Sequence, residues 1–504
     1  MRSQRFLIGS DMLWALVILA GFLFFTSLIP LPPNDYWWHL RIGEAITDGQ
    51  GIPVSNQYSW SVSPDKPFFY AAWFSEVLLY FFHRAGGLEL NIFMRNLLAA
   101  LSFWLVGVEA RRRSGSWRIA ALMLAFVCLM STNNLIVRPQ MFAWLPFMVI
   151  YLSLSRFTND HASHKLLLLC PIMIILWVNL HGSFVIGLGM IVIYLLGEYL
   201  RFLLKQEGSL SNSQLGWLAA ATGASFLAVL VNPRFIAIVS YIKNLLTSQP
   251  VQQLIEEWQP PTPHGLANMV FFGSILVLLV GLAISRARLT PSEILLMVAF
   301  LWLAWGSQRS VTWYGMIAMP LLGKVWKALP IRTPSMPAQR NLVNNVLVVL
   351  LFIPVIMVQP WFVDQFPLPD TYKSQIQNDP KIGPLMSLHT PIGAARYIAQ
   401  HPGGQLFNEL GYGSYLIWAA PNEAVFIDPR IELYPQEIWD DYIHISDGID
   451  VTFLLEKYTI DRIILDRDIQ PELSRHLQGD PTWYLEYSDQ NTQLWRSSNN
   501  NGTR

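Results

Sequence analysis

Charged residues are scarce in this chain. They make up 13% of its 504 residues, while hydrophobic residues make up 53% and the mean hydropathy is +0.34. A soluble globular protein carries about 25% charged residues. The composition therefore excludes an ordinary soluble protein and predicts a polytopic α-helical membrane protein.

Cysteine and the common catalytic motifs are also lacking. The two cysteines, Cys128 and Cys170, lie inside apolar runs, which is typical of small core residues and excludes a disulfide framework. No His/Cys spacing of a metal site, no P-loop and no Gly-x-Gly-x-x-Gly is present. The segment Gly411–Gly413 is too short a pattern to bind a nucleotide, and we interpret it as a turn.

The charges that are present are unevenly distributed. Residues 363–504 hold 20 acids and 10 bases, a net charge of −10, so residues 1–362 have a net charge of +10. We predict a basic transmembrane domain at 1–362, a proline-containing linker at 363–390 and a soluble α/β domain at 391–497. The acidic tail argues against nucleic acid as a partner.

Apolar segments long enough to cross a bilayer recur through the first domain. The first of them follows Arg2 and Arg5 but lacks a small-x-small cleavage site, so we interpret it as an uncleaved span. We predict eleven spans near residues 11–31, 90–110, 117–135, 139–155, 166–181, 183–203, 215–232, 266–285, 291–306, 311–328 and 342–362.

The Lys and Arg residues set the predicted orientation. Of the 24 in residues 1–362, 16 lie on one side of this map, which predicts a cytoplasmic N-terminus by the positive-inside rule. The first outer loop is then 31–89, and the C-terminal domain is extracytoplasmic. Counting 70–83 as a span would move Arg111–Arg113 outside, so we predict a helix along the membrane surface there, ended by Gly86–Gly87.

An α/β pattern follows the linker. We predict strands at 405–408, 424–428 and 462–465, a terminal hairpin of 483–487 with 493–495, and helices at 391–400, 451–458 and 471–477. Strands that alternate with helices predict a partly parallel sheet.

The first outer loop gathers several functional groups directly after the first span. If Asp35 begins a helix, His39 lies one turn further on the same face, and Arg41 can pair with Glu44. The alternative is a helix that only anchors the chain at the membrane interface, with Trp37–Trp38 at headgroup depth.

Among the arginines on the predicted outer side, three lie at the ends of predicted spans or between two of them: Arg138, Arg234 and Arg309. Guanidinium groups bind phosphate bidentately, so these residues are candidate ligands of a phosphate. The alternative for each is a helix end with an arginine that reaches toward the headgroups. The other candidates for the same outer cavity are His39, Asn179, His181, Glu257 and Trp258. An interface histidine, an amide that joins two helices and a solvated loop acid are the plain alternatives for His181, Asn179 and Glu257.

Four segments carry a resemblance to a known superfamily. They are Asp35–Leu40, Trp177–Gly182, Gly413–Trp418 and Val425–Arg430. With the order of spans and outer domain, the chain resembles the GT-C superfamily of polyprenyl-phosphate-dependent glycosyltransferases, which includes protein mannosyltransferases, aminoarabinose transferases and oligosaccharyltransferases. More specifically, it resembles a set of largely uncharacterised bacterial membrane proteins of that type.

The resemblance implies a role for Asp35 as the catalytic acid of the first outer loop, with a Mg or Mn ion as a possible cofactor. Many relatives carry a second acid beside the first, whereas this chain has Asn34 and Tyr36. Glu44 or Glu257 are the candidates for a second carboxylate. The implied function is transfer of a sugar, as a hexosyltransferase, from a polyprenyl-phosphate donor to an unknown acceptor at the outer face of a bacterial plasma membrane.

Two alternatives remain open from the sequence. One is an outer-leaflet oligosaccharide ligase or polymerase. The other is a non-catalytic transporter or scaffold. A transporter predicts inverted repeats and polar residues near the membrane midplane, and neither is found in this sequence.

Overall fold

The computed structural model describes residues 7–247, 256–329, 339, 341–362, 385–489 and 491–498. The chain divides into two compact units. The first, here the helical unit, is Met1–Ile29, Glu89–Ser240 and Ile255–Phe366. The second, here the mixed unit, is Pro30–Leu88, Tyr241–Leu254 and Pro367–Arg504.

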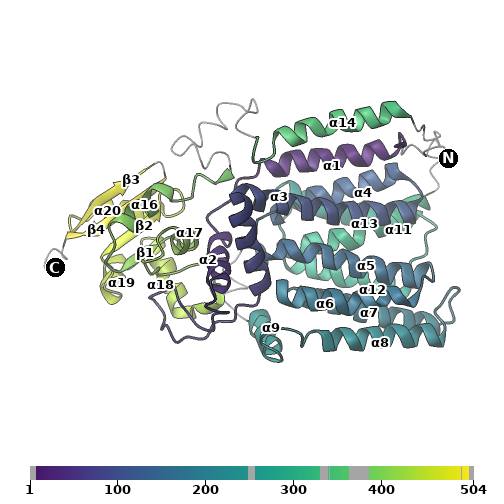
Figure 1. Ribbon diagram of the computed structural model, residues 1–504, viewed down its shortest axis with the longest axis horizontal. Helices are drawn as coiled ribbons and strands as arrows, with labels where there is room; N and C mark the ends of the chain where they lie inside the picture. Colours follow the sequence, from purple (N-terminus) through teal and green to yellow (C-terminus); the bar gives the residue numbers. More distant parts are fainter. Residues whose placement is uncertain are drawn as a thin grey trace. The chain divides into compact units, whose positions relative to one another are not determined.

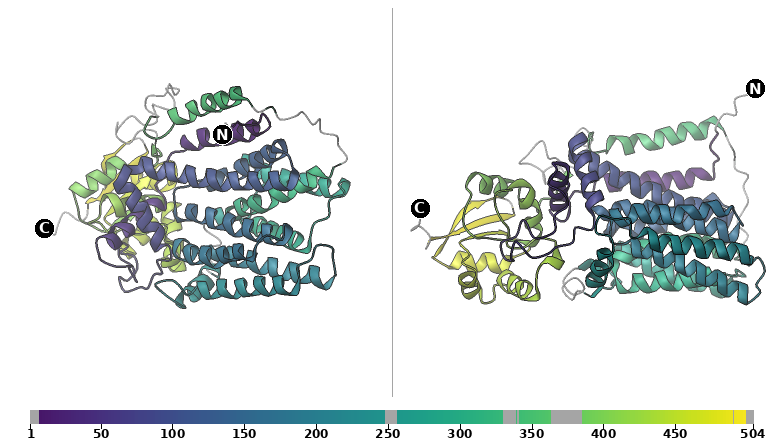
Figure 2. Two further views of the ribbon diagram at one scale, coloured as in Figure 1. Left: turned by 45° about the vertical axis from the view of Figure 1, so that its right-hand side comes forward. Right: turned by 60° about the horizontal axis from the view of Figure 1, so that its bottom comes forward.

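The helical unit is a bundle whose long helices run alongside one another in each view (Figures 1 and 2). Its α-helices are α1 (Met12–Ser27), the second part of α3 (Trp73–Ser114), α4 (Trp117–Met130), α5 (Trp144–Asn159), α6 (Leu169–Leu180), α7 (Phe184–Leu203), α8 (Asn212–Ala228), α11 (Leu266–Ile284), α12 (Pro291–Gly306), α13 (Val311–Lys327) and α14 (Leu342–Met357). Its short 3-10 helices are η1 (Thr132–Asn134), η2 (Pro139–Ala143), η3 (His164–Leu168), η4 (Glu256–Trp258) and η5 (Gln308–Ser310).

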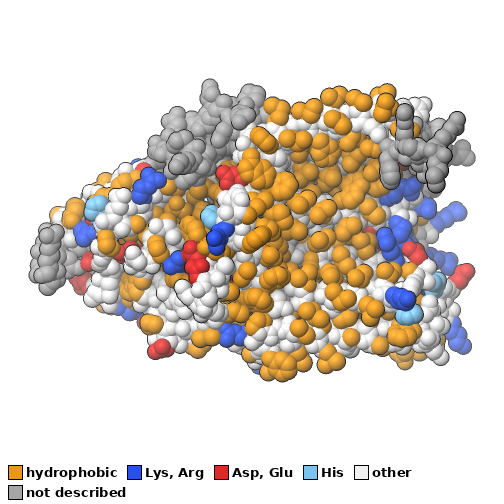
Figure 3. Space-filling model, in the orientation of Figure 1, with side chains coloured by type: hydrophobic (Ala, Val, Ile, Leu, Met, Phe, Trp, Pro, Cys, Tyr) orange, Lys and Arg blue, Asp and Glu red, His pale blue; other side chains and the backbone are white. Residues whose placement is uncertain are grey.

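The helices of this unit match the predicted apolar segments in place. Hydrophobic side chains cover the middle of the bundle, and Lys and Arg gather at one of its ends (Figure 3). Within the described residues, four helices are long and apolar enough to cross a membrane: Trp73–Ser114, Pro139–Asn159, Phe184–Leu203 and Leu266–Ile284. The helical membrane class is therefore supported, while the total of eleven spans stays a prediction.

Two capping boxes begin helices of the bundle. Ser211 and Gln214 begin α8, and Thr290 and Glu293 begin α12, each pair exchanging side-chain and backbone hydrogen bonds. These bonds satisfy backbone N–H groups that have no partner within the helix. Helix α13 packs against α4, α11 and α12, and its residues from Val311 to Gly323 are all buried.

Helix α3 is interrupted where the sequence predicts the end of the surface helix. Gly87 has φ +67° and ψ −158°, and Gly86 has φ −161°. The Gly87 conformation is open essentially only to glycine, because it lacks Cβ. The break separates the helix of the first loop from the apolar helix that follows, as predicted.

The mixed unit contains a four-stranded sheet in the order β1-β2-β4-β3. Strand β1 (Leu406–Asn408) pairs in parallel with β2 (Arg462–Asp466), and β4 (Thr492–Ser497) pairs antiparallel with β2 and with β3 (Trp483–Ser488). The sheet is therefore partly parallel, and the terminal hairpin is confirmed. The helices are α2 (Tyr36–Thr47), the first part of α3, most of α9 (Ala237–Thr247), α16 (Ile392–Gln400), α17 (Leu410–Ala419), α18 (Gln436–Ser446), α19 (Val451–Lys457), α20 (Pro471–Gly479) and the 3-10 helix η8 (Ile431–Leu433).

The first loop and the C-terminal segment share one core within this unit. Ser59 forms a parallel bridge with Val425, and Leu31 forms another with Met386. The Trp60 Nε1–H donates to the Leu406 carbonyl at 3.0 Å. Segments some 350 positions apart in the chain are therefore joined by backbone hydrogen bonds.

Two predicted elements of the C-terminal segment are wrong. Gly411–Gly413 lies inside α17 and is not a turn, since the Glu409 carboxylate accepts from the Tyr412 N–H at 2.8 Å and starts the helix. A Cβ at Gly413 would lie 2.1 Å from the Ile427 carbonyl oxygen, so this glycine permits close packing. Residues 424–428 form no strand beyond the single bridge at Val425. Most of the predicted linker, 363–384, lies outside the described residues.

The interpretation of Trp37 and Trp38 as interfacial anchors is also wrong. Their exposed fractions are 4% and 7%. The Trp37 ring packs edge-on against Tyr415 at 4.9 Å, and Trp38 lies against Tyr70. Helix α2 is thus a core helix of the mixed unit, because eight of its 12 residues are buried.

Candidate functional site

Four loops of the helical unit bring polar side chains together at one end of the bundle. Arg138 directly precedes η2, His181 follows α6, Glu257 lies in η4 and Arg309 lies in η5. With their neighbours Gln140 and Trp258, these residues form what we call the outer cluster. The sequence predicted five of the six members, because the alternation of helices places these loops at the same end.

The strongest contact of the outer cluster is an ion pair. Arg138 donates to the Glu257 carboxylate at 2.6 Å, and Arg138 is only 5% exposed. Burial alone would raise the pKa of Glu257, but Arg138 and Arg309 both lower it, so its pKa lies below the ordinary value. Glu257 is therefore an anion at neutral pH.

Arg309 is held in one orientation by three neighbours. Its Nε–H donates to Gln140 Oε1 at 3.0 Å, and its guanidinium carbon lies 5.5 Å from the centre of the Trp258 ring. Its terminal nitrogen lies 3.3 Å from His181 Nε2. The planar guanidinium is thus fixed by an amide and an aromatic ring, which suits recognition of an anion.

Backbone contacts fix the loops that carry these side chains. The Gln308 N–H donates to the Gln259 carbonyl at 2.9 Å, and Ser307 Oγ donates to the Glu257 carbonyl at 2.9 Å. Asn134 Nδ2 donates to the Gln308 carbonyl at 3.3 Å. Because η1, η4 and η5 are joined in this way, the charged groups are held in place by the fold before any ligand arrives.

Two residues predicted to line the cavity, Asn179 and Arg234, make other contacts than those of the outer cluster. Asn179 donates to the Ile175 and Val231 carbonyls at 2.8 Å each, so it joins α6 to the end of α8, as the plain alternative proposed. Arg234 lies in the turn after α8, where its N–H donates to Asn232 Oδ1 at 2.8 Å. The contacts described above join Arg138 and Arg309 through Glu257 but do not include Arg234.

The predicted residues of the first loop lie in the mixed unit. Asp35 is the N-cap residue of α2, and its carbonyl accepts from the His39 N–H at 3.3 Å. Arg41 and Glu44 form an ion pair, as predicted, and Tyr80 donates to Glu44 at 3.4 Å. Glu44 therefore has a structural partner, and its catalytic role stays a prediction.

The sequence analysis overlooked the carboxyl group of Glu76. It is fully buried, and its Oε1 lies 2.8 Å from His39 Nδ1. Burial raises the pKa of Glu76 well above its ordinary value. The signal in the sequence was a single acid inside the apolar run 70–83. Its partner His39 ties α2 to the first part of α3.

A metal site at Asp35 finds no support in the donor groups of the described segments. The one group of three ligand side chains found there is His389, Asp466 and Asp468, whose ligand atoms lie within 4.8 Å of one another. Asp466 already accepts from His389 at 2.7 Å and Tyr412 at 3.0 Å, and from two backbone N–H groups. Hydrogen bonds account for the positions of these side chains, and the same three groups have the spacing to hold a metal ion.

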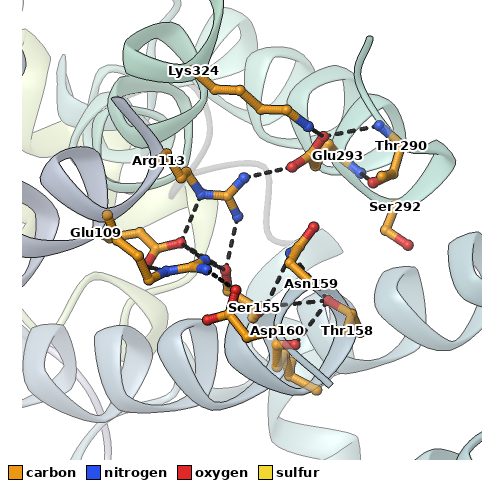
Figure 4. A network of polar contacts seen from close by, with 12 residues as sticks. Glu109, Arg113, Ser155, Thr158, Asn159, Asp160, Thr290, Ser292, Glu293 and Lys324 are labelled. Carbon is orange, nitrogen blue, oxygen red and sulfur yellow. Dashed lines mark hydrogen bonds and ion pairs between the residues drawn. The ribbon is translucent and has the colours of Figure 1, made fainter. Parts of the chain in front are cut away.

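The opposite end of the bundle carries a buried charge network (Figure 4). Arg113 contacts Glu109 at 2.6 Å and Glu293 at 2.5 Å, and Lys324 contacts Glu293 at 2.6 Å. Ser155, near the end of α5, donates to Glu109 at 2.6 Å. The network joins α3, α5, α12 and α13, and it accounts for part of the Lys/Arg accumulation at that end.

Comparison with known proteins identifies the fold. No family model and no curated protein matches the chain. Several solved structures are similar to it, and three of them are described here. The archaeal oligosaccharyltransferase AglB from Archaeoglobus fulgidus, in complex with an inhibitory peptide and a dolichol-phosphate, has a TM-score of 0.55 and 12% identity over 97% of this chain and 74% of that chain. The arabinofuranosyltransferase AftD from Mycobacteria has a TM-score of 0.53 and 14% identity over 97% of this chain and 42% of that chain. ArnT from Cupriavidus metallidurans, bound to undecaprenyl phosphate, has a TM-score of 0.48 and 15% identity over 95% of this chain and 97% of that chain.

Proposed function

We propose that this chain, whose fold is that of the GT-C superfamily, is a membrane glycosyltransferase that moves a sugar from a polyprenyl-phosphate donor to an acceptor. The fold is that of AglB and AftD, whose names describe transfer of oligosaccharyl and arabinofuranosyl groups. The observation that carries the proposal is the outer cluster. It holds two fixed arginines and one ionised glutamate, and therefore one excess positive charge, at one end of an apolar bundle.

The chemistry of a lipid-linked donor matches these features. The polyprenyl chain partitions into the bilayer, so the phosphate is presented at headgroup depth, where bundle helices end. Displacement at the sugar carbon leaves negative charge on the departing phosphate, and prearranged guanidinium groups stabilise that charge. Arg138 and Arg309 are the proposed phosphate ligands, with Arg234 as a third candidate.

Asp35 is the proposed general base that takes the proton of the acceptor hydroxyl. Its position as the N-cap of α2 holds its backbone in a defined geometry at the start of a buried helix. The proposed location is a bacterial plasma membrane with an extracytoplasmic C-terminal domain. The comparisons do not favour the alternatives of a ligase or polymerase, or of a transporter or scaffold.

The proposal is tested by incubating the purified protein in nanodiscs with a panel of polyprenyl-phosphate sugars. Mass spectrometry then follows formation of the free polyprenyl phosphate, a product that reports donor use whatever the acceptor. We expect turnover by the wild type and a loss of at least about 100-fold in Asp35→Asn. Asp48→Asn, at the exposed C-terminal end of the same helix, is the matched control. Absence of turnover with every donor, or equal rates for Asp35→Asn and the wild type, contradicts the proposal.

A further inference from the structure

The helix ends beside the buried charge network carry more bases than the network uses. The bases in the last turns of α3 and α13 are Arg111, Arg112, Arg113, Lys324 and Lys327. Arg112 and Arg113 pair with Glu109. Lys324 pairs with Glu293 (Figure 4). In the described part of the chain, Arg111 and Lys327 form no ion pair, so each helix end leaves one base over.

The two remaining bases converge on one glycine. The ends of α3 and α13 pack closely, since a Cβ at Gly323 would lie 3.6 Å from the Ala110 carbonyl oxygen. Gly115 follows α3 with φ +77° and is exposed. A Cβ at Gly115 would lie 3.8 Å from Lys327 Nζ and 4.0 Å from Arg111 Nη1. The two cationic groups are therefore no further apart than the sum of these distances, beside a residue that contributes no side chain.

No carboxylate of the described residues balances these two charges. Each acid around the network already pairs with another base, and these acids are Glu109, Asp160, Glu198 and Glu293. Two like charges at short range repel each other, and an anion between them removes that cost. A phosphodiester offers two anionic oxygens, of which a guanidinium can bind both and an ammonium binds either as a point charge.

The surface beside Gly115 indicates that the anion belongs to a lipid. Helix α4 begins two residues after Gly115, and Arg118, Leu122 and Leu129 are exposed on it. Their spacing of four and seven residues puts them on one face of the helix. An apolar stripe thus leads away from a basic helix end, which matches a phospholipid with its charged headgroup at the bundle end and its acyl chains alongside the helices.

We propose that Arg111 and Lys327 bind the phosphate of an anionic phospholipid beside Gly115, with the acyl chains along the exposed face of α4. We call this the lipid corner. It lies at the end of the bundle opposite the outer cluster, so it does not depend on the proposed glycosyl transfer. Because its two bases come from α3 and α13, the bound lipid joins these helix ends and stabilises the folded state by mass action.

Lipid titrations followed by native mass spectrometry test the lipid corner in the purified full-length protein. The probes are phosphatidylglycerol, phosphatidylcholine with the same acyl chains, and inorganic phosphate. We expect phosphatidylglycerol to bind at least about tenfold more tightly than phosphatidylcholine. Arg111→Gln and Lys327→Gln should each weaken phosphatidylglycerol binding about fivefold, and the double variant at least about tenfold. Lys327→Arg keeps the charge and should stay within about twofold of the wild type.

Lys205→Gln is the matched control, because Lys205 is an exposed base that follows α7 and forms no ion pair among the described residues. It should change phosphatidylglycerol binding by less than about twofold. An equal loss in Lys205→Gln and Lys327→Gln shows a general attraction to a basic surface and overturns the lipid corner. Unchanged phosphatidylglycerol binding in the folded double variant, or equal binding of the two lipids by the wild type, also overturns it.

Two further measurements complete the test. Inorganic phosphate that binds as tightly as phosphatidylglycerol contradicts the assignment to a lipid. Thermal unfolding in detergent without lipid shows whether each variant is folded. Added phosphatidylglycerol should then raise the melting temperature of the wild type more than that of the double variant, and an equal rise in both contradicts the proposed site.

Discussion

Arg138 and Glu257 stand 119 positions apart in the chain, and their side chains form a 2.6 Å ion pair in the outer cluster. The pair holds η4 against the loop that begins η2. It also sets the charge of the cluster, because Glu257 cancels one of two arginines. Under the proposed function, the same carboxylate stabilises the fold and weakens phosphate binding.

Glu257→Gln separates these two effects. The change leaves a buried guanidinium without its counter-charge, which we expect to cost about 2 kcal/mol and to lower the melting temperature. It also raises the net charge of the cluster by one, so binding of undecaprenyl phosphate should become tighter. Calorimetry and titration measure the two quantities. Glu207→Gln, in an exposed loop, is the control, and weaker phosphate binding in Glu257→Gln would contradict the model of a basic cluster.

The same pair predicts a dependence of stability on pH. Arg138 and Arg309 hold the pKa of Glu257 below 4.5, so the folded state binds fewer protons than the unfolded state as the pH falls. The stabilisation is complete above about pH 4.5 and is lost as the pH falls through the lower, folded pKa. We expect the difference in melting temperature between the wild type and Glu257→Gln to be constant at neutral pH and to shrink in acid. A difference that widens in acid would exclude this account.

The break in α3 predicts that Gly87 is intolerant of substitution. Its φ of +67° with ψ of −158° is open essentially only to glycine, so Gly87→Ala should cost about 1–3 kcal/mol. Gly86→Ala is the control at the neighbouring position, whose φ of −161° lies outside the left-handed region. Thermal unfolding of the two variants decides the question, and equal melting temperatures would show that the break is not fixed by backbone conformation.

The buried charge network allows a comparison of a buried and an exposed partner of one arginine, Arg112. Arg112 contacts Glu109, whose side chain is 1% exposed, and Asp160, whose side chain is 47% exposed. Glu109→Gln removes a buried counter-charge of two arginines and should cost about 3 kcal/mol. Asp160→Asn should cost less than about 1 kcal/mol, because water screens an exposed pair. Thermal unfolding in the same detergent compares them, and a larger loss in Asp160→Asn would reverse the interpretation.

The raised pKa of Glu76 predicts that its charge is dispensable. Burial raises the pKa of Glu76 and so favours its neutral form, which an amide mimics; Glu76→Gln should therefore retain the contact with His39 and change stability by less than about 1 kcal/mol. Glu76→Ala removes the partner of His39 and leaves a cavity, which should cost about 2–3 kcal/mol. Comparable losses in the two variants would instead indicate an essential carboxylate.

The positions of the bundle helices could be predicted because a bilayer demands long apolar segments with internally bonded backbones. The alternation of helix direction then placed the loops of Arg138, His181, Glu257 and Arg309 at one end, and their contacts bear this out. The role of Gln140 could not be predicted, since an amide beside an arginine becomes meaningful only when the loops are in place.

The errors concern residues whose partners are remote in sequence. Adjacent tryptophans such as Trp37 and Trp38 are typical of residues at a membrane interface. Nothing near them in the sequence indicates that Tyr415 and Tyr70 are their neighbours in the fold. The pattern around Gly413 is typical of a turn. In the structure, this residue is a glycine in a helix, and its small size lets the Ile427 carbonyl oxygen come close. Local patterns carry no information about such contacts, because tertiary packing overrides propensity.

The bridges of Leu31 to Met386 and of Ser59 to Val425 also constrain the order of events during synthesis. The segment that follows α1 emerges from the ribosome early, whereas β2 and β4, which complete the sheet beside it, emerge last. Trp37 therefore lacks the Tyr415 ring that packs against it while the whole helical unit is synthesised. A chain that stops before α17 leaves this apolar surface uncovered, and such surfaces recruit chaperones and aggregate.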